Sequence, residues 1–380
     1  MISPSKNNGG NKMHRKTSSF FIIPPVIGSV ILLMFLIVPV TSLSGDGSQD
    51  IGPLPKIKAS DPEKIELGKL LFFDLRLSGD ANLSCASCHQ PEKGWADGQD
   101  LSAAYPGSKY FRNTQTILNM AHKRYFYWDG RLTGKDPDTQ VRDKITETHF
   151  MNLDGRLMQE RLKQVPEYVV RFKKAFGGEP SFGKTLQAIA AFEQTLISQN
   201  VPFDSAKISE GAQKGLDLFK GKAGCIQCHN GPMFSDFEPY KLGVPEHPEL
   251  FTDPERATTF RSVLKFLGVP NFENLRKDPG FFIVSKLKED FGKFLTPSLR
   301  EVSRTAPYMH NGTIATLEDV VDFKNRGGGE GSESKPLNLS ADEKKALVAF
   351  LKSLSGDEIT VDPPRIPEYQ VIANWREMPN

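Results

Sequence analysis

Two Cys-x-x-Cys-His pentads contain all four cysteines of this 380-residue chain. They are Cys85-Ala-Ser-Cys88-His89 and Cys225-Ile-Gln-Cys228-His229. In such a pentad the two thiols are spaced to bond the two vinyl groups of one haem, and the imidazole that follows can ligate the iron. The chain is therefore expected to carry two covalently bound c-type haems, with His89 and His229 as proximal iron ligands.

Two other chemistries use paired cysteines. A zinc site can be built from four thiolates, and a redox centre can be built from each Cys-x-x-Cys pair. Neither explains why a histidine follows the second cysteine in both copies. Haem attachment is the interpretation that the complete pentads favour.

Similar segments flank the two pentads. Gly68-Lys-Leu-Leu-Phe72 precedes the first, and Gly215-Leu-Asp-Leu-Phe219 precedes the second. Ala191-Phe192 and Ala349-Phe350 follow them inside apolar patterns of helical period. Taken alone, each Gly-x-x-Leu-Phe segment would indicate ordinary helix packing. Together the segments predict a duplicated unit of a helix, a pentad, a long loop region and a closing helix.

The composition favours two small domains joined by irregular segments. The chain is 38% hydrophobic, and at roughly 100–200 residues per domain its length suggests two. It has 32 glycines, 27 prolines and little strand-like alternation, which indicates helices joined by extended loops. We expect a mainly α fold with two cytochrome c-like domains, at residues 61–204 and 205–364, followed by a tail at 365–380.

Charge and the N-terminal pattern bear on partners and location. The net charge is +2 and the basic residues are interspersed with acidic ones, so no nucleic acid partner is expected. Basic residues precede an apolar run from Phe20 to Val40, and small residues follow it. Residues 1–44 are therefore expected to be a signal peptide or a membrane anchor, with a linker at 45–60. The body is expected in the periplasm or on the outer side of the cytoplasmic membrane.

Further motifs follow one another in a specific order. They are Leu67–Ser78, Arg112-Asn113, Trp128-Asp129-Gly130-Arg131, Val165–Tyr168, Pro297–Arg300 and Thr305–Tyr308. With these motifs, the chain from about Lys56 to Pro364 resembles the bacterial dihaem cytochrome c peroxidases and their relative MauG.

The resemblance implies a role for each haem. In that family hydrogen peroxide reacts at the first haem. The second haem passes electrons inward from a small donor protein such as a cytochrome c or a cupredoxin. Trp128 matches a tryptophan that lies between the haems and relays electrons or holes, although taken alone it would be a core aromatic. Family members commonly dimerise, so a homodimer is one expectation.

The resemblance also implies a calcium ion between the domains. Asn113, Thr305 and Pro307 match its ligand positions, the latter two through main-chain oxygens. A site made only of oxygen ligands suits Ca²⁺. Taken alone, Asn113 would be a turn residue.

The first haem site departs from the peroxidase pattern in two ways. Residues 101–109 contain no histidine to cap the iron, so we expect an open haem, with Tyr105 and Tyr110 the nearest alternative covers. The family has a glutamate before a methionine as the acid–base group that peroxide cleavage needs, and here Phe150 precedes Met151. Glu147 or His149 is expected to substitute if the loop is remodelled. For His149, a packing role is the alternative.

The second haem site departs at its sixth ligand. Lys324 occupies the position where peroxidases have a methionine and MauG-like proteins a tyrosine. A neutral amine can ligate ferric haem, although a solvated lysine is the alternative. Met309 is the fallback ligand, with core packing as its alternative. A nitrogen donor would give this haem a lower potential than a thioether would.

These expectations combine into one function and two alternatives. The chain is expected to be an exported oxidoreductase that reduces hydrogen peroxide at the first haem with electrons delivered through the second. One alternative is MauG-like, peroxide-dependent oxidation of a partner protein. The other is a non-enzymatic dihaem electron carrier or redox sensor, which the loss of the glutamate at Phe150 would favour.

Overall fold

The computed structural model of the chain describes residues 50–369. The described residues form one compact unit. The predicted signal or anchor segment lies outside the described residues, as do residues 45–49 of the predicted linker and the end of the predicted tail. Among the described helices, none is long and apolar enough to cross a membrane.

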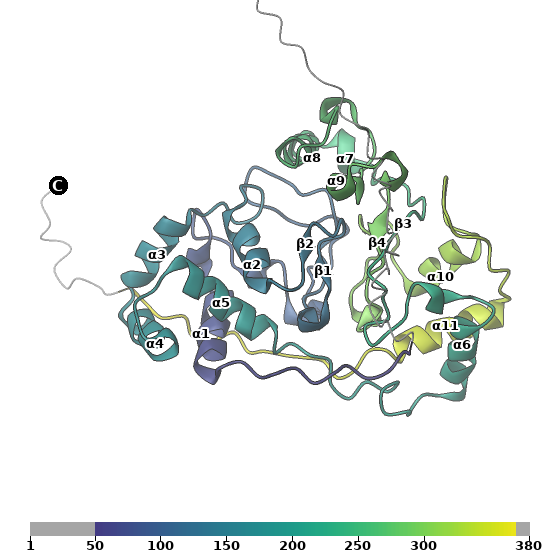
Figure 1. The fold of residues 1–380 in the computed structure, drawn as a ribbon, viewed down its shortest axis with the longest axis horizontal. Helices are drawn as coiled ribbons and strands as arrows, with labels where there is room; N and C mark the ends of the chain where they lie inside the picture. The colour runs from purple at the N-terminus through teal and green to yellow at the C-terminus, as the bar shows by residue number, and fades with distance from the viewer. Residues whose placement is uncertain (1–49, 370–380) are drawn as a thin grey trace, which may run out of the picture. The chain divides into compact units, whose positions relative to one another are not determined.

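The described residues are mainly helical, as expected, and the strands are very short (Figure 1). The helices are α1 (Pro62–Phe72), α2 (Pro137–Thr146), α3 (Gly155–Lys163), α4 (Pro166–Phe176), α5 (Phe182–Glu193), α6 (Glu210–Lys220), α7 (Glu249–Thr252), α8 (Pro254–Phe266), α9 (Phe282–Ser285), α10 (Leu317–Asn325) and α11 (Ala341–Lys352). The strands form two antiparallel pairs: β1 (Tyr125–Phe126) with β2 (Leu132–Thr133), and β3 (Pro239–Tyr240) with β4 (Phe294–Leu295).

Most of the described helices begin where the sequence offers a capping side chain. Asp61 accepts a hydrogen bond from the Glu63 N–H at the start of α1, and Pro62 is its first residue. Ser209 caps α6, and Ser340 forms a reciprocal capping box at the start of α11. These caps satisfy donors that a helix end otherwise leaves without partners.

The first helix pair, α1 with α5, packs backbone against backbone. A Cβ atom placed on Gly68 of α1 would lie 1.9 Å from the carbonyl oxygen of Ala188 in α5. Only glycine permits this approach. One turn further along each helix, the rings of Phe72 and Phe192 meet edge to face with centroids 5.2 Å apart.

The second helix pair, α6 with α11, repeats this contact. A Cβ atom on Gly215 would lie 2.0 Å from the carbonyl oxygen of Ala346, and the Phe219 and Phe350 ring centroids are 5.0 Å apart. The matching segments of the sequence therefore occupy matching positions in two helix pairs, and the predicted duplication is confirmed. The boundaries drawn at residues 204 and 364 stay predictions.

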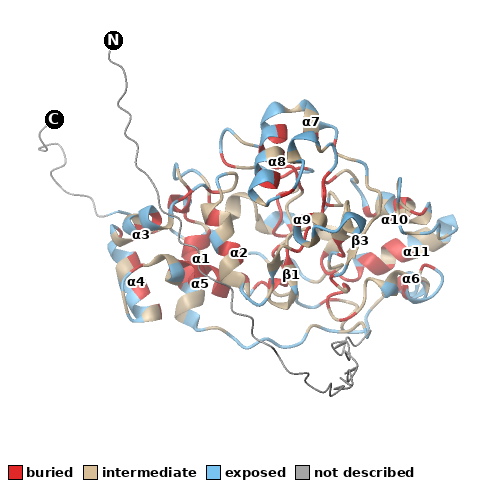
Figure 2. Ribbon diagram, turned by 45° about the horizontal axis from the view of Figure 1, so that its top comes forward, coloured by how far each residue is buried: buried red, intermediate tan, exposed pale blue. Residues whose placement is uncertain are grey.

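Most buried hydrophobic residues in the described part of the chain fall into three clusters. One surrounds the first helix pair and α4, and a second surrounds the second helix pair and α10. A third joins α7, α8 and α9 to Tyr110 and Phe111. Figure 2 colours the buried residues red. This third cluster was not expected from the sequence, and through Tyr110 it reaches the edge of the first pentad's cavity.

The ends of the described chain cross between the two helix pairs. Ile51 packs against the second cluster, and the Gly52 carbonyl accepts a hydrogen bond from Arg300 at 2.6 Å. In the other direction, Ile359 packs against the first cluster, and its carbonyl accepts from Trp95 Nε1 at 2.8 Å. Segments predicted as a linker and as the end of the second domain thus each contribute to the opposite half (Figure 1).

Candidate haem pockets

Each pentad folds as a short 3-10 turn that presents its histidine in one orientation. The His89 N–H donates to the Cys85 carbonyl at 3.0 Å, and the His229 N–H donates to the Cys225 carbonyl at 2.8 Å. His89 Nδ1 lies 3.0 Å from the Trp95 carbonyl oxygen, and His229 Nδ1 lies 2.9 Å from that of Phe234. A carbonyl partner makes Nδ1 the protonated nitrogen and leaves Nε2 free to ligate a metal.

The four cysteines are free thiols. Burial raises the pKa of Cys88 and that of Cys225 to about 11, so both carry a proton at neutral pH. A reactive dithiol would require a thiolate at this pH. Within residues 50–369, no group of three or more His, Cys, Asp or Glu side chains could hold a metal ion. The geometry fits thioether attachment of haem and does not support the two cysteine alternatives.

Two cavities lie beside the pentads. The first cavity is lined by Cys85, Cys88 and His89, and the second cavity by Cys225, Cys228 and His229. Residues 113–116, Lys123, Tyr127 and Trp128 line both cavities, and we call them the shared wall. Trp128 therefore lies between the two predicted haem sites. Its indole N–H donates to the Asn113 carbonyl at 3.0 Å, which orients its ring.

A buried ionic network supports the shared wall. Arg112 donates to Asp129 at 2.6 Å and to both carboxylate oxygens of Asp278 at 2.7 and 2.8 Å. Arg131 also donates to Asp129, at 2.9 Å. Burial opposes ionisation of Asp129, but the two arginines outweigh it and lower the pKa of its carboxyl to about 2. The network connects the Arg112-Asn113 and Trp128–Arg131 motifs, which explains why they occur together.

The predicted acid–base substitutes do not reach the first cavity. His149 Nε2 and Glu147 Oε2 are 3.0 Å apart, and the His149 ring stacks on Tyr110 with centroids 5.2 Å apart. Tyr110 and Phe150 line the first cavity, whereas Glu147 and His149 do not. Tyr105, the other proposed cover, is also absent from the lining. Neither Glu147 nor His149 lines the first cavity, and their acid–base role stays a prediction.

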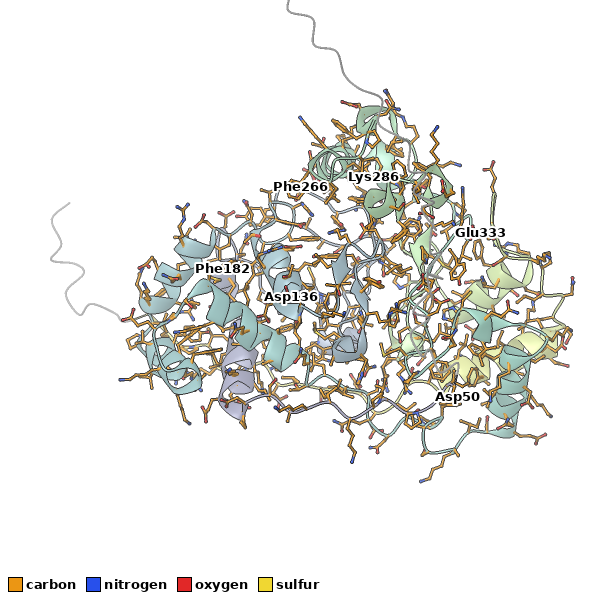
Figure 3. All side chains as sticks on the ribbon, viewed as in Figure 1. Asp50, Asp136, Phe182, Phe266, Lys286 and Glu333 are labelled. Atoms are coloured by element: carbon orange, nitrogen blue, oxygen red, sulfur yellow. The ribbon has the colours of Figure 1, made fainter. Side chains whose placement is uncertain are left out.

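Helix α2 contributes two polar side chains that sequence reasoning missed. Asp136, labelled in Figure 3, caps this helix by accepting from the Thr139 N–H at 3.3 Å. Gln140 and Lys144, one turn apart on the same face, both line the first cavity. Gln140 Oε1 is buried without a hydrogen-bond partner. The sequence did hold a signal for them, because Gln140 and Lys144 lie one helical turn apart just before the Glu147–Met151 stretch.

Both predicted ligands of the second haem line the second cavity. Lys324, in the last turn of α10, donates to the Ser334 hydroxyl at 2.8 Å. Burial lowers its pKa, against the opposing influence of the two cysteines. Met309 lines the same cavity, as do Asn113, Thr305 and Pro307, the residues matched to a calcium site. The sixth ligand and the calcium ion stay predictions.

Two pentads with oriented histidines, on duplicated helix pairs and on either side of a shared wall, define a dihaem c-type protein. Comparison with known proteins identifies the family. The di-haem cytochrome c peroxidase family matches residues 62–213. The chain is 51% identical over 334 residues to the cytochrome-c peroxidase IdrP2 of Pseudomonas sp. strain SCT, covering 86% of this chain and 91% of that one.

More distant relatives agree. MauG of Methylorubrum extorquens is 34% identical over 330 residues, covering 83% of this chain and 84% of its own. The crystal structure of a MauG-like protein associated with microbial copper homeostasis superposes with a TM-score of 0.66 at 28% identity, covering 81% of this chain and 93% of that one. The chain therefore belongs to the dihaem cytochrome c peroxidase and MauG family, and it is a peroxidase-type oxidoreductase with haem c as its cofactor.

Proposed function

We propose that this protein reduces hydrogen peroxide at the His89 haem, with electrons that reach it from the His229 haem across Trp128. The observation that carries the proposal is the position of Trp128 in the wall that both cavities share. Tryptophan is a polarisable aromatic whose indole N–H here has a fixed carbonyl partner, Asn113. Its ring is therefore held in one orientation between the two sites.

The side chains of the first cavity have distinct tasks in this proposal. Cys85 and Cys88 would bind the haem covalently, and His89, oriented by the Trp95 carbonyl, would ligate its iron. When bound, haem supplies the peroxide-binding iron and the one-electron chemistry. Phe150 and Tyr110 form an apolar lining that limits access of water. Gln140 offers an amide to a bound peroxide.

The proposal also covers the substrate, the electron donor, the location and a bound calcium ion. Hydrogen peroxide is the substrate, and a small cytochrome c or cupredoxin is the electron donor. The protein is exported to the periplasm, since a basic stretch followed by an apolar run precedes the described residues. Asn113, Thr305 and Pro307 bind a calcium ion beside the second cavity, whose lining includes all three.

One observation favours a second candidate function. Lys324 lines the second cavity where the peroxidases of the family have a methionine. A nitrogen ligand stabilises ferric iron and lowers the potential of that haem. A low-potential second haem suits storage of oxidising equivalents for a partner protein, as in MauG-like oxidation.

Electron paramagnetic resonance of the purified ferric holoprotein, before and after addition of hydrogen peroxide, tests the proposed function. We expect a high-spin signal from one haem that disappears with peroxide. Rapid peroxide consumption with a reduced small cytochrome c would then support peroxidase activity. Slow consumption with a long-lived oxidised spectrum would support oxidation of a partner protein. Two low-spin signals that peroxide does not change would contradict both candidates.

The Lys324→Met variant is expected to raise the potential of the second haem. A thioether favours ferrous iron more than an amine does. We expect an increase on the order of 0.1 V, within the roughly 0.8 V range that axial ligands cover. Spectroelectrochemical titration of the holoprotein measures it. Lys345→Met is the matched control, because the Lys345 side chain in α11 is 80% exposed. Equal potentials in Lys324→Met and wild type would rule out ligation by Lys324.

A further inference from the structure

The first cavity lacks the carboxylate that the family pattern predicts beside the peroxide site. Phe150 occupies that position, and Glu147 and His149 lie outside the lining. Cleavage of peroxide still needs a group that moves a proton between its two oxygens. Some other side chain of the first cavity must therefore supply it if the proposed function is correct.

Lys144 is a partly buried lysine that lies against aromatic rings at this cavity. Its Nζ lies 3.4 Å from the centroid of the Phe150 ring and 4.4 Å from that of Tyr127. Among the described residues, none forms a hydrogen bond or an ion pair with this amine. A cation over ring faces gains a modest attraction, but the rings cannot accept its protons as an oxygen would. The amine therefore remains available to a ligand in the cavity.

The titratable and charged groups around Lys144 come from every element that surrounds it. They are Asp143 on α2, Glu147 and His149 after it, Arg131 after β1, Glu193 on α5, and Cys88 and His89 of the pentad. Burial and then Arg131 lower the pKa of the Lys144 amine to about 7, against the raising influence of Glu147, Cys88 and Asp143. Near neutral pH the amine can therefore both accept and donate a proton.

Gln140 provides an independent sign that a ligand occupies this side of the cavity. It is 7% exposed, and its Oε1 has no partner. A buried amide oxygen left unpaired is costly unless a bound molecule completes it. Because Gln140 and Lys144 lie one turn apart on α2, a single small polar molecule can contact both.

We propose that Lys144 is the proton-transfer residue of the peroxide site and that Gln140 orients the peroxide beside it. This inference rests on the proposed function. We call the peroxide oxygen nearer the haem site the inner oxygen and the other one the outer oxygen. The inner oxygen gives its proton to the neutral amine of Lys144, and the resulting ammonium returns that proton to the outer oxygen. The O–O bond then breaks with two electrons from the protein, and the outer oxygen leaves as water. Two protons from solvent release the inner oxygen as a second water, and the donor restores the two electrons.

Glu193 is the competing candidate in the same cavity. Burial raises the pKa of its carboxyl to about 8, and its Oε2 has no partner. Lys123 and then Lys144 oppose this rise, and Glu193 in turn raises the pKa of the Cys85 thiol. Lys144, by contrast, lies over the Phe150 ring. Glu193 thus belongs to the side where the haem would be attached.

The pH dependence of the reaction with peroxide tests the inference in the holoprotein. For wild type, we expect the second-order rate, followed by stopped-flow absorbance, to rise with pH through about 7, because only the neutral amine accepts a proton. In Lys144→Met the second-order rate is expected to fall roughly 10²–10⁴-fold. The rise of that rate with pH, which we call the pH limb, should also disappear. Lys135→Met, an exposed lysine just before α2, should match wild type. Haem content and far-ultraviolet circular dichroism confirm that each variant is folded.

Fluoride binding to the ferric protein gives a readout that needs no turnover. The protonated amine can donate a hydrogen bond to iron-bound fluoride, so Lys144→Met is expected to bind fluoride roughly tenfold more weakly at pH below the amine's pKa. Lys144→Arg, which keeps the charge but cannot act as a base, should retain fluoride affinity and lose the peroxide rate.

The possible outcomes separate the inference from the proposed function. A wild type that reacts with peroxide while Lys144→Met keeps the same rate and pH profile would overturn only the role of Lys144. Loss of the pH limb in Glu193→Gln but not in Lys144→Met would assign the role to Glu193 and overturn it as well. A low-spin first haem that becomes high-spin in Lys144→Met would make the lysine a ligand and not a base. A wild type that ignores peroxide would overturn both proposals.

Discussion

Replacing Arg112 with methionine is expected to lower the free energy of unfolding by about 3–5 kcal/mol. The Arg112 side chain is 2% exposed and pairs with Asp129 and Asp278, whose side chains are 0% and 1% exposed. Its removal leaves Asp278 without its cationic partner, and Asp129 with Arg131 alone. An unpaired buried charge costs far more than an exposed ion pair contributes. Chemical denaturation of the holoprotein, followed by circular dichroism, measures the loss.

Arg142→Met is the matched control for this variant. Arg142 pairs with Asp143, but its side chain is 49% exposed, so the change should stay within about 1 kcal/mol. Equal stability of Arg112→Met and Arg142→Met would contradict the role assigned to the network. Arg112→Met should also make the Trp128 side chain more mobile, since the network supports the shared wall next to it.

Acid should weaken the same network in a defined direction. The pKa of Asp129 is about 2 in the folded protein, below the ordinary value for an aspartate. A carboxyl with a depressed pKa contributes stability above its unfolded pKa of about 4, and this contribution is lost as the pH falls towards 2. In Asp129→Asn the pH dependence of stability between about 4 and 2 should be shallower than in wild type. Equal slopes in the two proteins would argue against the ionised pair.

Replacing Gly215 with alanine is expected to destabilise the second helix pair by about 1–3 kcal/mol or more. The added Cβ would lie 2.0 Å from the Ala346 carbonyl oxygen and 2.7 Å from Phe350 Cβ, so α6 and α11 would have to separate. This strain exceeds the helix propensity that alanine gains over glycine, about 1 kcal/mol. Thermal and chemical denaturation of the holoprotein measure the net change.

Gly211→Ala in the same helix should have the opposite sign. The nearest atom to a Cβ on Gly211 is the Ser209 hydroxyl oxygen at 3.9 Å, so the methyl group meets open space. With no strain, alanine should stabilise the protein by about 0.4–1 kcal/mol through a less flexible unfolded chain. If Gly215→Ala and Gly211→Ala changed the stability in the same direction, close packing of α6 against α11 would not explain why residue 215 is a glycine.

Much of the architecture could be predicted from residues that lie close together in the sequence. The spacing of two thiols and an imidazole within a pentad is a local property, so it indicated the haem sites before any fold was known. The repeat of Gly68 and Phe72 at Gly215 and Phe219 indicated a duplicated helix pair for the same reason. The structure adds why these residues recur, since Gly68 and Gly215 are where two helix backbones touch.

The chemistry of the first cavity could not be predicted in this way. Alignment to the family pattern drew attention to Glu147 and His149, because they are the ionisable residues nearest in sequence to the missing glutamate. Which side chains line a cavity depends on how a helix and its following loop pack, and here Phe150 and Tyr110 separate His149 from it. Lys144 reaches the cavity because it lies one helical turn after Gln140 on α2.

The sequence by itself therefore determined the cofactor class, the duplicated helical units and the attachment residues, because each depends on contacts a few residues apart. Only the tertiary structure decided that Arg112 pairs with Asp278, 166 residues away, and that Trp128 lies between two cavities. It also decided that Lys144, and not Glu147, faces the first cavity. These outcomes follow from long-range packing, which brings together side chains that no local pattern connects.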